Sequence, residues 1–252
     1  MPATTFPGVL DAQLRTDAAR PLVTFYDDAT GERVELSVTT YANWVAKTAS
    51  LLQDELDIER GRLALVDLPT HWLGAVWLGA AWSLGLRVTD DPALLVEEGG
   101  PDIVACGPDR LDEYADLAAT VPVVAMSLRP MAGRFTEALP TGVVDYSAVV
   151  LGQPDAFTPY DPSTPDDEAW VGGERRSQAQ LVAMAESSTL LDPGGRLLTD
   201  VNPCSDAGLA TLLAPLVAGG GTVWVRHPDE AGWERRREAE RATATLRAQP
   251  GA

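Results

Sequence analysis

The stretch WVGGERRSQAQL, beginning at Trp170, carries residue types that could bind an anion. An apolar strand-like run leads into two glycines, and two arginines and a serine follow before a polar helix start. Glycines let backbone N–H groups turn toward an anion, a helix N-terminus adds a favourable dipole, and arginine holds a phosphate group with two hydrogen bonds. This pattern predicts a site for AMP or ATP with an affinity no better than about the millimolar scale. Its residues are Gly172, Gly173, Arg175, Arg176 and Ser177.

The same residues have a simpler structural interpretation, which we favour. Two glycines are enough for a turn, and Ser177 has the residue type of a helix N-cap. A phosphate loop normally adds a lysine beside its glycines. Lys47 is the only lysine of the chain, however, and it lies in YANWVAKTASLL, where a solvent-facing helix position is expected. The sequence therefore predicts a turn and a cap first, and no cofactor other than weakly bound AMP or ATP.

Histidines, cysteines and acidic runs give no catalytic or metal site. His71 and His227 are the only histidines, and both lie next to proline-containing loop sequence, where we expect them exposed and without a catalytic role. Cys106 and Cys204 form no CxxC pair and are expected to be buried thiols. The acids at 90–91 and 166–168 could bind a divalent ion weakly, but acidic runs in loops are usually solvated, and this is what we expect of them. The sequence thus predicts no catalytic residue and no metal ion.

The charge and the apolar pattern of the chain restrict its partners. It has 37 Asp and Glu against 19 Lys and Arg, a formal net charge of −18 at pH 7, so its field repels nucleic acid and anionic membrane surfaces. The beginning, MPATTFPGVL, lacks the basic segment and apolar core of a signal peptide, which favours the cytoplasm. The longest apolar run, WLGAVWLGAAWSLGL, is shorter than the roughly 20 residues that span a bilayer, so it predicts a core helix.

The elements that would position these residues alternate between strand and helix. Two apolar runs around Gly31 predict a β-hairpin, and a period of three to four residues over 39–52 predicts a helix. The run 63–68 has the composition of a buried strand, and 72–84 that of a helix ended by Gly85. Further strands are expected in LRVT, DIVACG, PVVAM, AWVGG, GRLLTDV and TVWV. This alternation predicts an α/β fold with a mostly parallel sheet and helices on both faces.

One domain is expected. Residues 1–22 are expected to form a partly ordered N-terminal segment, and 23–248 a single α/β domain. Within it, QPDAFTPYDPSTPDDE (153–168) is rich in proline and acids, so it can form neither a helix nor a central strand and is expected to be a surface connector. The tail DEAGWERRREAERATATL is expected to be a solvated helix, because acids and arginines recur at helical spacing.

The order of these segments resembles that of a known superfamily. The sequence VELSVTTYANWVAKTASLLQDELDIERGRLALVDLPTHWLGAVWLGAAWSLGLRV is similar to the opening of adenylate-forming enzymes, the acyl-CoA synthetase and AMP-dependent ligase group. STPDDEAWVGG resembles the approach to that superfamily's phosphate loop, and GRLLTDVNPCSDAGLATLLAPLVAGGGTVWV resembles the segment after it. The resemblance covers 23–246 and is greatest to a small actinobacterial family of unassigned function, distantly similar to AMP-binding enzymes. It implies a fold matching about half of the superfamily's large domain.

The resemblance places only Gly172 and Gly173 in the superfamily's phosphate loop. The hydroxyl run, second glycine pair and Pro-Lys-Gly end of that loop have no counterpart before Ser177, and the later motifs of the superfamily would lie beyond Ala252. Losing one transition-state donor typically costs about 2.7–4 kcal/mol. The resemblance therefore implies a degenerate AMP-binding-enzyme-like protein, a pseudoenzyme that lacks complete adenylation activity. It would bind a small ligand or another protein, either a partner or a second copy.

Two other functions stay open. One is an ATP-dependent acyl-adenylating ligase completed by a partner chain that supplies the missing lysine and aspartate. The other is a scaffold or oligomerisation module that uses sheet edges exposed by a shortened fold. Neither the acyl substrate nor the partner can be read from the sequence.

Overall fold

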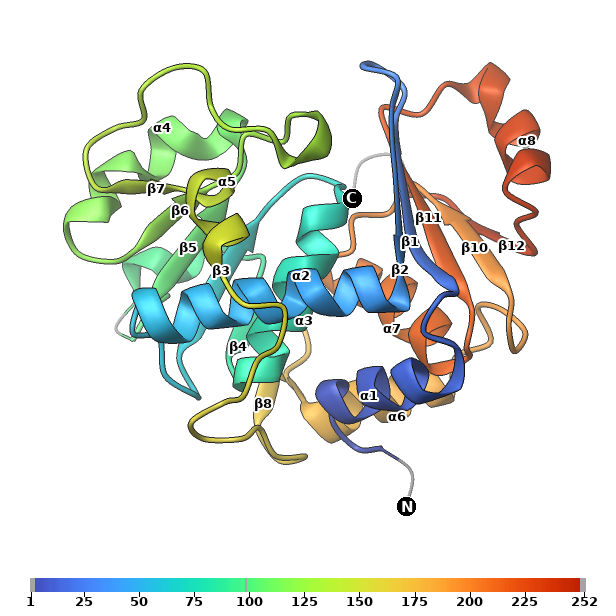
Figure 1. Cartoon of the computed structure of the whole chain (residues 1–252), viewed down its shortest axis with the longest axis horizontal. Coiled ribbons are helices and arrows are strands. Elements are labelled where there is room, and N and C mark those ends of the chain that lie inside the picture. The colour runs from blue at the N-terminus through green and yellow to red at the C-terminus, as the bar shows by residue number, and fades with distance from the viewer. Residues whose placement is uncertain (1–2, 98, 250–252) are drawn as a thin grey trace. The chain divides into compact units, whose positions relative to one another are not determined.

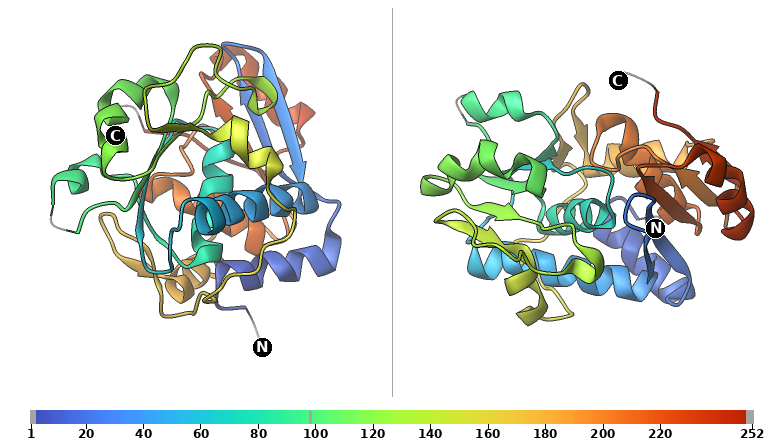
Figure 2. Two further views of the ribbon diagram at one scale, coloured as in Figure 1. Left: turned by 60° about the vertical axis from the view of Figure 1, so that its left-hand side comes forward. Right: turned by 90° about the horizontal axis from the view of Figure 1, so that it is seen from above.

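The computed structural model describes residues 3–97 and 99–249, whose contacts divide the chain into two compact units. Unit 1 comprises 1–42, 69–75 and 178–252, and unit 2 comprises 43–68 and 76–177. Each unit contains a sheet of its own (Figure 1, Figure 2). The α/β class with mostly parallel strands is confirmed, but two sheets are present where the sequence predicts one. The reason is that strands near both ends of the chain pair with one another in unit 1, which local patterns do not reveal.

The sheet of unit 1 has the strand order β12-β10-β11-β1-β2. Neighbouring strands are parallel except β1 and β2, which form the predicted hairpin. The hairpin turn uses Gly31 at a φ of +76°, a conformation that favours glycine. The strands are β1 (Pro21–Asp27), β2 (Glu32–Ser37), β10 (Arg196–Thr199), β11 (Gly221–Arg226) and β12 (Ala244–Leu246).

Helices cover both faces of this sheet, because successive side chains of a strand point to opposite faces. On β11, Trp224 Nε1 donates to Thr211 Oγ1 of α7 (Leu209–Val217) at 3.1 Å. The next side chain, Val225, packs on the other face with Trp233 of α8 (Glu230–Ala239). Helices α1 (Phe6–Asp17) and α6 (Gln178–Glu186) contact α7 (Figure 1). The sheet is therefore covered by helices on each side, as the sequence predicts.

The N-terminal segment is packed into unit 1. Thr5 caps α1 by accepting a hydrogen bond from Gly8 N at 3.3 Å, and Phe6 and Leu10 are buried. Phe6 N also donates to Gln178 Oε1 at 2.9 Å, which joins the start of α1 to the start of α6. The segment expected to be partly ordered, 1–22, thus contains a helix that contacts with distant residues hold in place.

The sheet of unit 2 has the strand order β7-β6-β5-β3-β4-β8-β9. All neighbours are parallel except β8 and β9, which form an antiparallel hairpin. The central strands β3 and β5 are almost completely buried, in agreement with their continuous apolar sequences. The strands are β3 (Leu63–Asp67), β4 (Arg87–Thr89), β5 (Ile103–Cys106), β6 (Val123–Ala125), β7 (Val143–Asp145), β8 (Glu168–Trp170) and β9 (Arg176–Ser177).

Helix α3 (Trp72–Leu84) has the predicted bounds and is buried along its whole length. Leu78 and Trp82 have no exposed surface, and Trp82 Nε1 donates to Ala169 O at 2.9 Å. The expectation of a core helix is therefore confirmed. Within 3–97 and 99–249, no helix has the length and apolar character to cross a membrane.

The other helices are shorter or less regular. Helix α2 (Val38–Ser50) ends in a π-helical turn, η1 (Leu51–Glu55), and residues 108–119 form three short helical pieces. Those pieces are η3 (Pro108–Arg110), α4 (Leu111–Tyr114) and η4 (Ala115–Ala119). The remaining ones are η2 (Pro92–Val96), η5 (Pro130–Ala132), α5 (Tyr146–Val149), η6 (Val150–Gly152) and η7 (Asp206–Gly208).

The connector at 153–168 has no helix or strand before β8 and is held by residues of α2 and η1. Lys47 Nζ donates to Gln153 O at 2.5 Å and pairs with Asp155 at 3.1 Å. Gln53 Oε1 accepts a hydrogen bond from Tyr160 N at 2.9 Å. The expectation that Lys47 faces solvent is wrong: only 18% of its side chain is exposed, because the connector passes over it.

Candidate functional site

The β8–β9 hairpin carries the five residues of the predicted anion site. Gly172 and Gly173 lie in its bend, and Ser177 is the last residue of β9, directly before α6 begins. β9 therefore separates the glycines from the helix start, whereas the sequence predicts a single strand-to-helix junction. A Cβ at Gly172 would lie 2.4 Å from Trp170 Nε1, so the bend requires a residue without a side chain there.

Both arginines of the predicted site bond carboxylates of the same hairpin. Arg175 Nη1 lies 3.0 Å from Glu168 Oε1, and Arg176 Nη2 lies 2.7 Å from Glu174 Oε2. The guanidinium groups of both predicted anion-binding arginines therefore already have a carboxylate neighbour. Binding of AMP or ATP at this hairpin stays a prediction.

A cavity of about 740 Å³ lies at the carboxyl ends of β10 and β12 in unit 1. Ligands of α/β proteins usually bind at this edge, where loops leave a parallel sheet. Thr70 reaches the cavity from segment 69–75, and its Oγ1 donates to Asp200 O at 3.2 Å. The lining residues are Thr70, Asp200, Val201, Asn202, Ser205, Ala207, Leu246, Arg247, Ala248 and Gln249.

The charged residues of this cavity bond one another. Arg247 Nε donates to Asp200 Oδ2 at 2.9 Å, and Ala248 N donates to Asp200 Oδ1 at 2.6 Å. Arg247 Nη1 also donates to Glu230 Oε2 at 3.1 Å. The polar side chains that remain in the lining are uncharged, so the cavity offers hydroxyl and amide groups rather than a net charge. They are Thr70, Asn202, Ser205 and Gln249.

The loop after β10 is shaped by bonds within itself. Ser205 Oγ donates to Asn202 O at 2.8 Å and accepts from Gly208 N at 3.1 Å. Asn202 Oδ1 accepts from Cys204 N at 3.0 Å. A Cβ at Gly208 would lie 1.7 Å from Asn202 O, so only glycine fits. Sequence reasoning missed these cavity residues, although the Asn-Pro pair followed by serine and glycine in NPCSDAG is a turn signal.

His71 is buried, which corrects the expectation that it lies exposed in a loop. Only 1% of its surface is accessible, its Nδ1 accepts from Leu73 N at 3.2 Å, and its ring packs edge-on against Phe25. Burial, reinforced by the positive charge of Arg226, lowers the pKa of His71 to about 3, so the ring is neutral at pH 7. The segment has a loop-like sequence, but it packs against strands of unit 1 that are distant along the chain.

His227 and the two cysteines lie as the sequence predicts, whereas Asp167 is not solvated: only 15% of its side chain is exposed, and its Oδ1 lies 2.6 Å from Arg60 Nη2. The side chain of His227 is 52% exposed, and its Nδ1 lies 2.9 Å from Asp27 Oδ1. Cys106 and Cys204 are buried, and neither forms a disulfide. Burial raises the pKa of Cys106 to about 12, so this thiol is not a reactive nucleophile near neutral pH.

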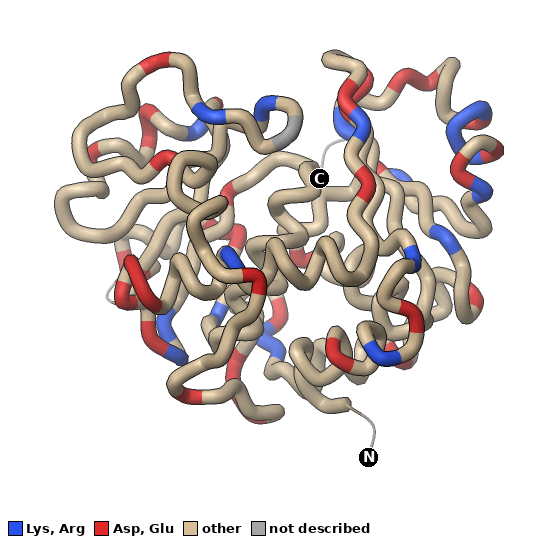
Figure 3. Tube along the Cα trace, in the orientation of Figure 1, with Lys and Arg blue, Asp and Glu red and all other residues tan. Residues whose placement is uncertain are grey.

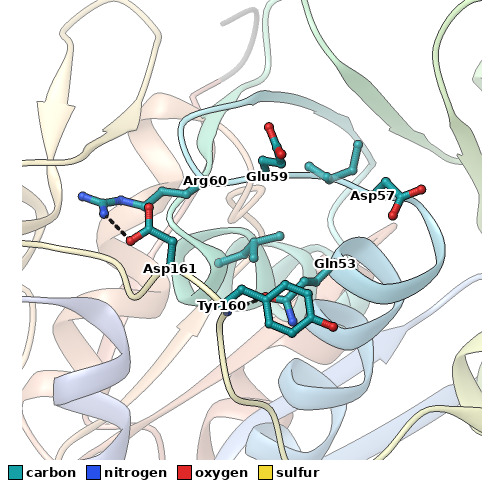
Figure 4. A pocket seen from close by; sticks show the side chains of 8 residues that line it. Gln53, Asp57, Glu59, Arg60, Tyr160 and Asp161 are labelled. Atoms are coloured by element: carbon teal, nitrogen blue, oxygen red, sulfur yellow. Dashed lines mark hydrogen bonds and ion pairs between the residues drawn. The ribbon is translucent and has the colours of Figure 1, made fainter.

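A second cavity, of about 450 Å³, lies in unit 2 beside the connector (Figure 4). Asp57, Glu59 and Asp161 line it together with Arg60 and Tyr160. Arg60 Nη1 lies 2.9 Å from Asp161 Oδ1, so the cation of this cavity is paired with one of its carboxylates. Acidic residues are spread over elements of both units (Figure 3). Among the residues that the structure describes, no group of three or more His, Cys, Asp or Glu is arranged to hold a metal ion.

Solved structures with the same arrangement define the fold class. The acyl-CoA synthetase of Brucella canis superposes with a TM-score of 0.75 and 16% identity over 95% of this chain and 47% of its own. The fatty acyl-adenylate ligase of L. pneumophila, solved with acyl adenylate and pyrophosphate, superposes with a TM-score of 0.73 and 13% identity. The match covers 96% of this chain and 44% of the ligase. The chain therefore has the fold of about half of an adenylate-forming enzyme, as the sequence resemblance implies. It spans less than half the length of either protein.

A sequence relative places the chain in a family. A TIGR03089 family protein of Mycobacterium tuberculosis (strain ATCC 25618 / H37Rv) is 35% identical over 250 residues, which are 97% of this chain and 99% of the relative. The chain belongs to the TIGR03089 family. This relative is actinobacterial, in agreement with the resemblance seen in the sequence. No family model matches the chain.

Proposed function

We propose that this protein binds a small uncharged molecule in the cavity at the carboxyl ends of β10 and β12 and does not carry out complete adenylation. The cavity itself is the observation that carries this proposal. Its volume of about 740 Å³ falls in the range of about 300–1,000 Å³ that is typical of small-molecule sites. It also lies at the sheet edge where α/β proteins bind their ligands.

The lining favours a ligand that is neutral and partly apolar. A charged ligand would have to separate Asp200 from Arg247, which bond each other at 2.9 Å. Val201 and Leu246 provide apolar surface, and Ser205 also lines the cavity while its hydroxyl takes part in bonds within the loop. A molecule with one or two hydrogen-bonding groups on an apolar body suits this combination.

Three features weigh against adenylation by this chain alone. Lys47, the only lysine, is bonded to Gln153 O and paired with Asp155, so it already has partners in unit 2. The hairpin bend is short, and Arg175 lies against Glu168. Removing one donor to a transition-state charge typically costs about 2.7–4 kcal/mol, so the absence of several such donors leaves little catalysis.

A cavity-filling variant tests ligand binding. Ala207 is exposed at the lining, so Ala207→Trp should occupy the space without disturbing the core. Saturation-transfer NMR with a panel of small amides and alcohols should find a molecule bound with a Kd on the order of 1 mM or tighter. Binding should weaken at least about tenfold, or about 1.4 kcal/mol, in Ala207→Trp.

Ala231→Trp is the matched control, because Ala231 is exposed in unit 1 and does not line the cavity. It should bind the same molecules as the unmodified chain. If the panel gives no binder, or if both tryptophan variants bind equally well, the cavity is not the ligand site.

The second candidate is a ligase completed by a partner chain, and the coverage of the solved structures favours it. This chain matches 47% and 44% of two adenylate-forming proteins, so a second chain could supply the remainder. Adding the product of a neighbouring reading frame that encodes such a remainder should then produce carboxylic-acid-dependent pyrophosphate exchange. If the mixture remains inactive although the two proteins bind each other, this candidate is excluded.

A further inference from the structure

The cavity of about 450 Å³ in unit 2 has an aromatic wall that is held in place. Tyr160 lines the cavity, and 81% of its surface is exposed. The residue is nevertheless bonded at both ends, to two residues of η1. Its N–H donates to Gln53 Oε1 at 2.9 Å, and its hydroxyl donates to Asp54 Oδ1 at 2.9 Å. The ring therefore stays accessible to a ligand at a fixed position, beside the Gln53 side chain (Figure 4).

Two buried aliphatic residues give the same cavity an apolar surface. Ile58 and Leu84 line it and are only 6% and 2% exposed. Such side chains can pack against the alkyl part of a ligand and remove it from water. The cavity volume of about 450 Å³ falls within the range of about 300–1,000 Å³ that is typical of small-molecule sites. The cavity is thus large enough for a short aliphatic molecule.

The charged side chains of the lining carry a negative excess, because one cation faces three carboxylates: Arg60, Asp57, Glu59 and Asp161. The cation already has partners. Arg60 Nη1 lies 2.9 Å from Asp161 Oδ1, and its Nη2 lies 2.6 Å from Asp167 Oδ1. Since Arg60 is paired with two carboxylates, the cavity favours a positively charged ligand over an anion.

Asp57 supplies a carboxylate that is available to such a ligand. Asp57 is exposed, and within 3–97 and 99–249 its side chain forms no hydrogen bond or ion pair. The bond to Asp54 raises the pKa of Tyr160, and the charge of Asp57 raises that pKa further. The Tyr160 phenol is therefore uncharged at pH 7, with the Asp57 carboxylate near it. A cation is attracted both by a carboxylate and by the face of an aromatic ring.

We infer that this cavity binds a small organic cation, an ammonium group on a short alkyl chain. The ammonium group contacts Asp57 and the face of the Tyr160 ring, and the alkyl chain packs against Ile58 and Leu84. In the described part of the chain the acids form no group arranged to hold a metal ion, so the aromatic and apolar surfaces set the ligand class. The site lies in unit 2, separate from the cavity of the proposed function.

The test is a titration of butylamine at pH 7, followed by the ring resonances of Tyr160 in protein labelled with ¹³C-tyrosine. Tyr160→Leu assigns these resonances, because they are absent from its spectrum. Butylamine should bind with a Kd on the order of 1–10 mM at low ionic strength. Butan-1-ol has the same chain length and no charge, so it should bind at least about fivefold more weakly.

A charge variant at the lining identifies the carboxylate that binds the amine. Asp57→Asn removes the charge and keeps the shape, and asparagine suits the φ of +52° at this position. It should weaken butylamine binding about three- to fivefold and leave butan-1-ol binding unchanged. Glu137→Gln is the matched control, because Glu137 is exposed in unit 2 and does not line the cavity. Its Kd for butylamine should change less than about 1.5-fold.

Equal weakening in Asp57→Asn and Glu137→Gln would overturn the inference, because the net charge of −18 would then attract the amine without a site. Ala207→Trp, which fills the cavity of unit 1, should leave butylamine binding unchanged. A loss of butylamine binding in that variant would contradict a separate site in unit 2.

The unmodified chain provides a second measurement if Asp57→Asn does not fold. Raising the salt concentration from about 0.02 M to about 0.3 M should weaken butylamine binding several-fold, because salt screens exposed charges, and should not weaken butan-1-ol binding. Tyr160 resonances that do not respond to butylamine, or that respond equally to butan-1-ol, contradict the site.

Discussion

Arg247 Nε lies 2.9 Å from Asp200 Oδ2, so the residues that follow the parallel strands β12 and β10 are joined at the edge of the proposed ligand cavity. The Arg247 guanidinium carbon also lies 4.0 Å from the centre of the Trp233 ring in α8. One arginine therefore connects two strand ends and the helix that covers them.

Removing this arginine should destabilise the protein and loosen the cavity. Arg247→Ala loses two ion pairs, with Asp200 and Glu230, and a cation–π contact, which together contribute about 1 kcal/mol at a partly exposed position. Urea unfolding should show that loss. Arg15→Ala is the control, because Arg15 is exposed in α1 and removes the same charge; its unfolding midpoint should match that of the unmodified chain. An equal loss in both variants would mean that net charge, rather than this contact, is responsible.

Replacing Lys47 should release the connector. Lys47→Ala removes the bond to Gln153 O and the pair with Asp155. Thermolysin should then cut between 153 and 167 several times faster, because local opening of the segment becomes easier. Lys47→Arg keeps a cation at this position and should be cut more slowly than Lys47→Ala. If neither replacement changes the cleavage rate, Lys47 does not hold the connector.

A charge in the middle of α3 should prevent folding. Leu78 has no exposed surface, so Leu78→Asp would bury an unpaired carboxylate at a cost of several kcal/mol. Circular dichroism of that variant should show loss of cooperative thermal unfolding. Leu78→Met keeps the apolar volume and should cost less than about 1.5 kcal/mol. A Leu78→Asp protein as stable as Leu78→Met would contradict the burial of this helix.

Stability should decrease in mild acid because of His71. Its folded-state pKa of about 3 lies below the ordinary value of 6.5. Between these values the unfolded state binds the proton and the folded state does not, so the free energy of unfolding falls as pH drops below about 6.5. The contribution of His71 to this loss should be about 2 kcal/mol between pH 8 and pH 5.

The variant His71→Asn isolates that contribution. Asparagine can still accept the bond from Leu73 N, but it does not titrate. Urea unfolding of both proteins at pH 8 and pH 5 should therefore show a smaller decrease in the variant. An identical decrease in the two proteins would mean that other groups cause the whole acid sensitivity.

Sequence patterns correctly predicted the elements whose formation depends on residues close together in the chain. The apolar sequence 72–84 and the glycine after it predicted the bounds of α3, and the turn at Gly31 predicted the first hairpin. By contrast, β12 was expected to be part of a solvated helix, although Thr245 pairs with Leu198 of β10. Pairing between strands so far apart in sequence depends on partners that no local pattern contains.

In the candidate sites, too, local sequence patterns identify some residues, whereas others come together only through contacts between distant segments. The glycines and arginines near 172–177 could be identified because a phosphate loop has a local pattern. Glu168 was expected only to be solvated, because its bond to Arg175 depends on the hairpin that brings the two residues together. The cavity in unit 1 combines Thr70 with residues at 200–207 and 246–249, so it forms only when three distant segments meet. The burial of His71 could not be predicted either, because it depends on packing against Phe25, which is distant in the sequence.

The most direct test of the central claim is ATP–pyrophosphate exchange by the purified chain with Mg²⁺, ATP and a panel of carboxylic acids, together with amide and alcohol binding to the same preparation. We predict that exchange stays at the level of a boiled control while a neutral ligand binds, and that Ala207→Trp weakens this binding. Exchange that depends on an added acid, exceeds the boiled control and is lost in Lys47→Ala would contradict the proposal that this chain binds a ligand without adenylating it.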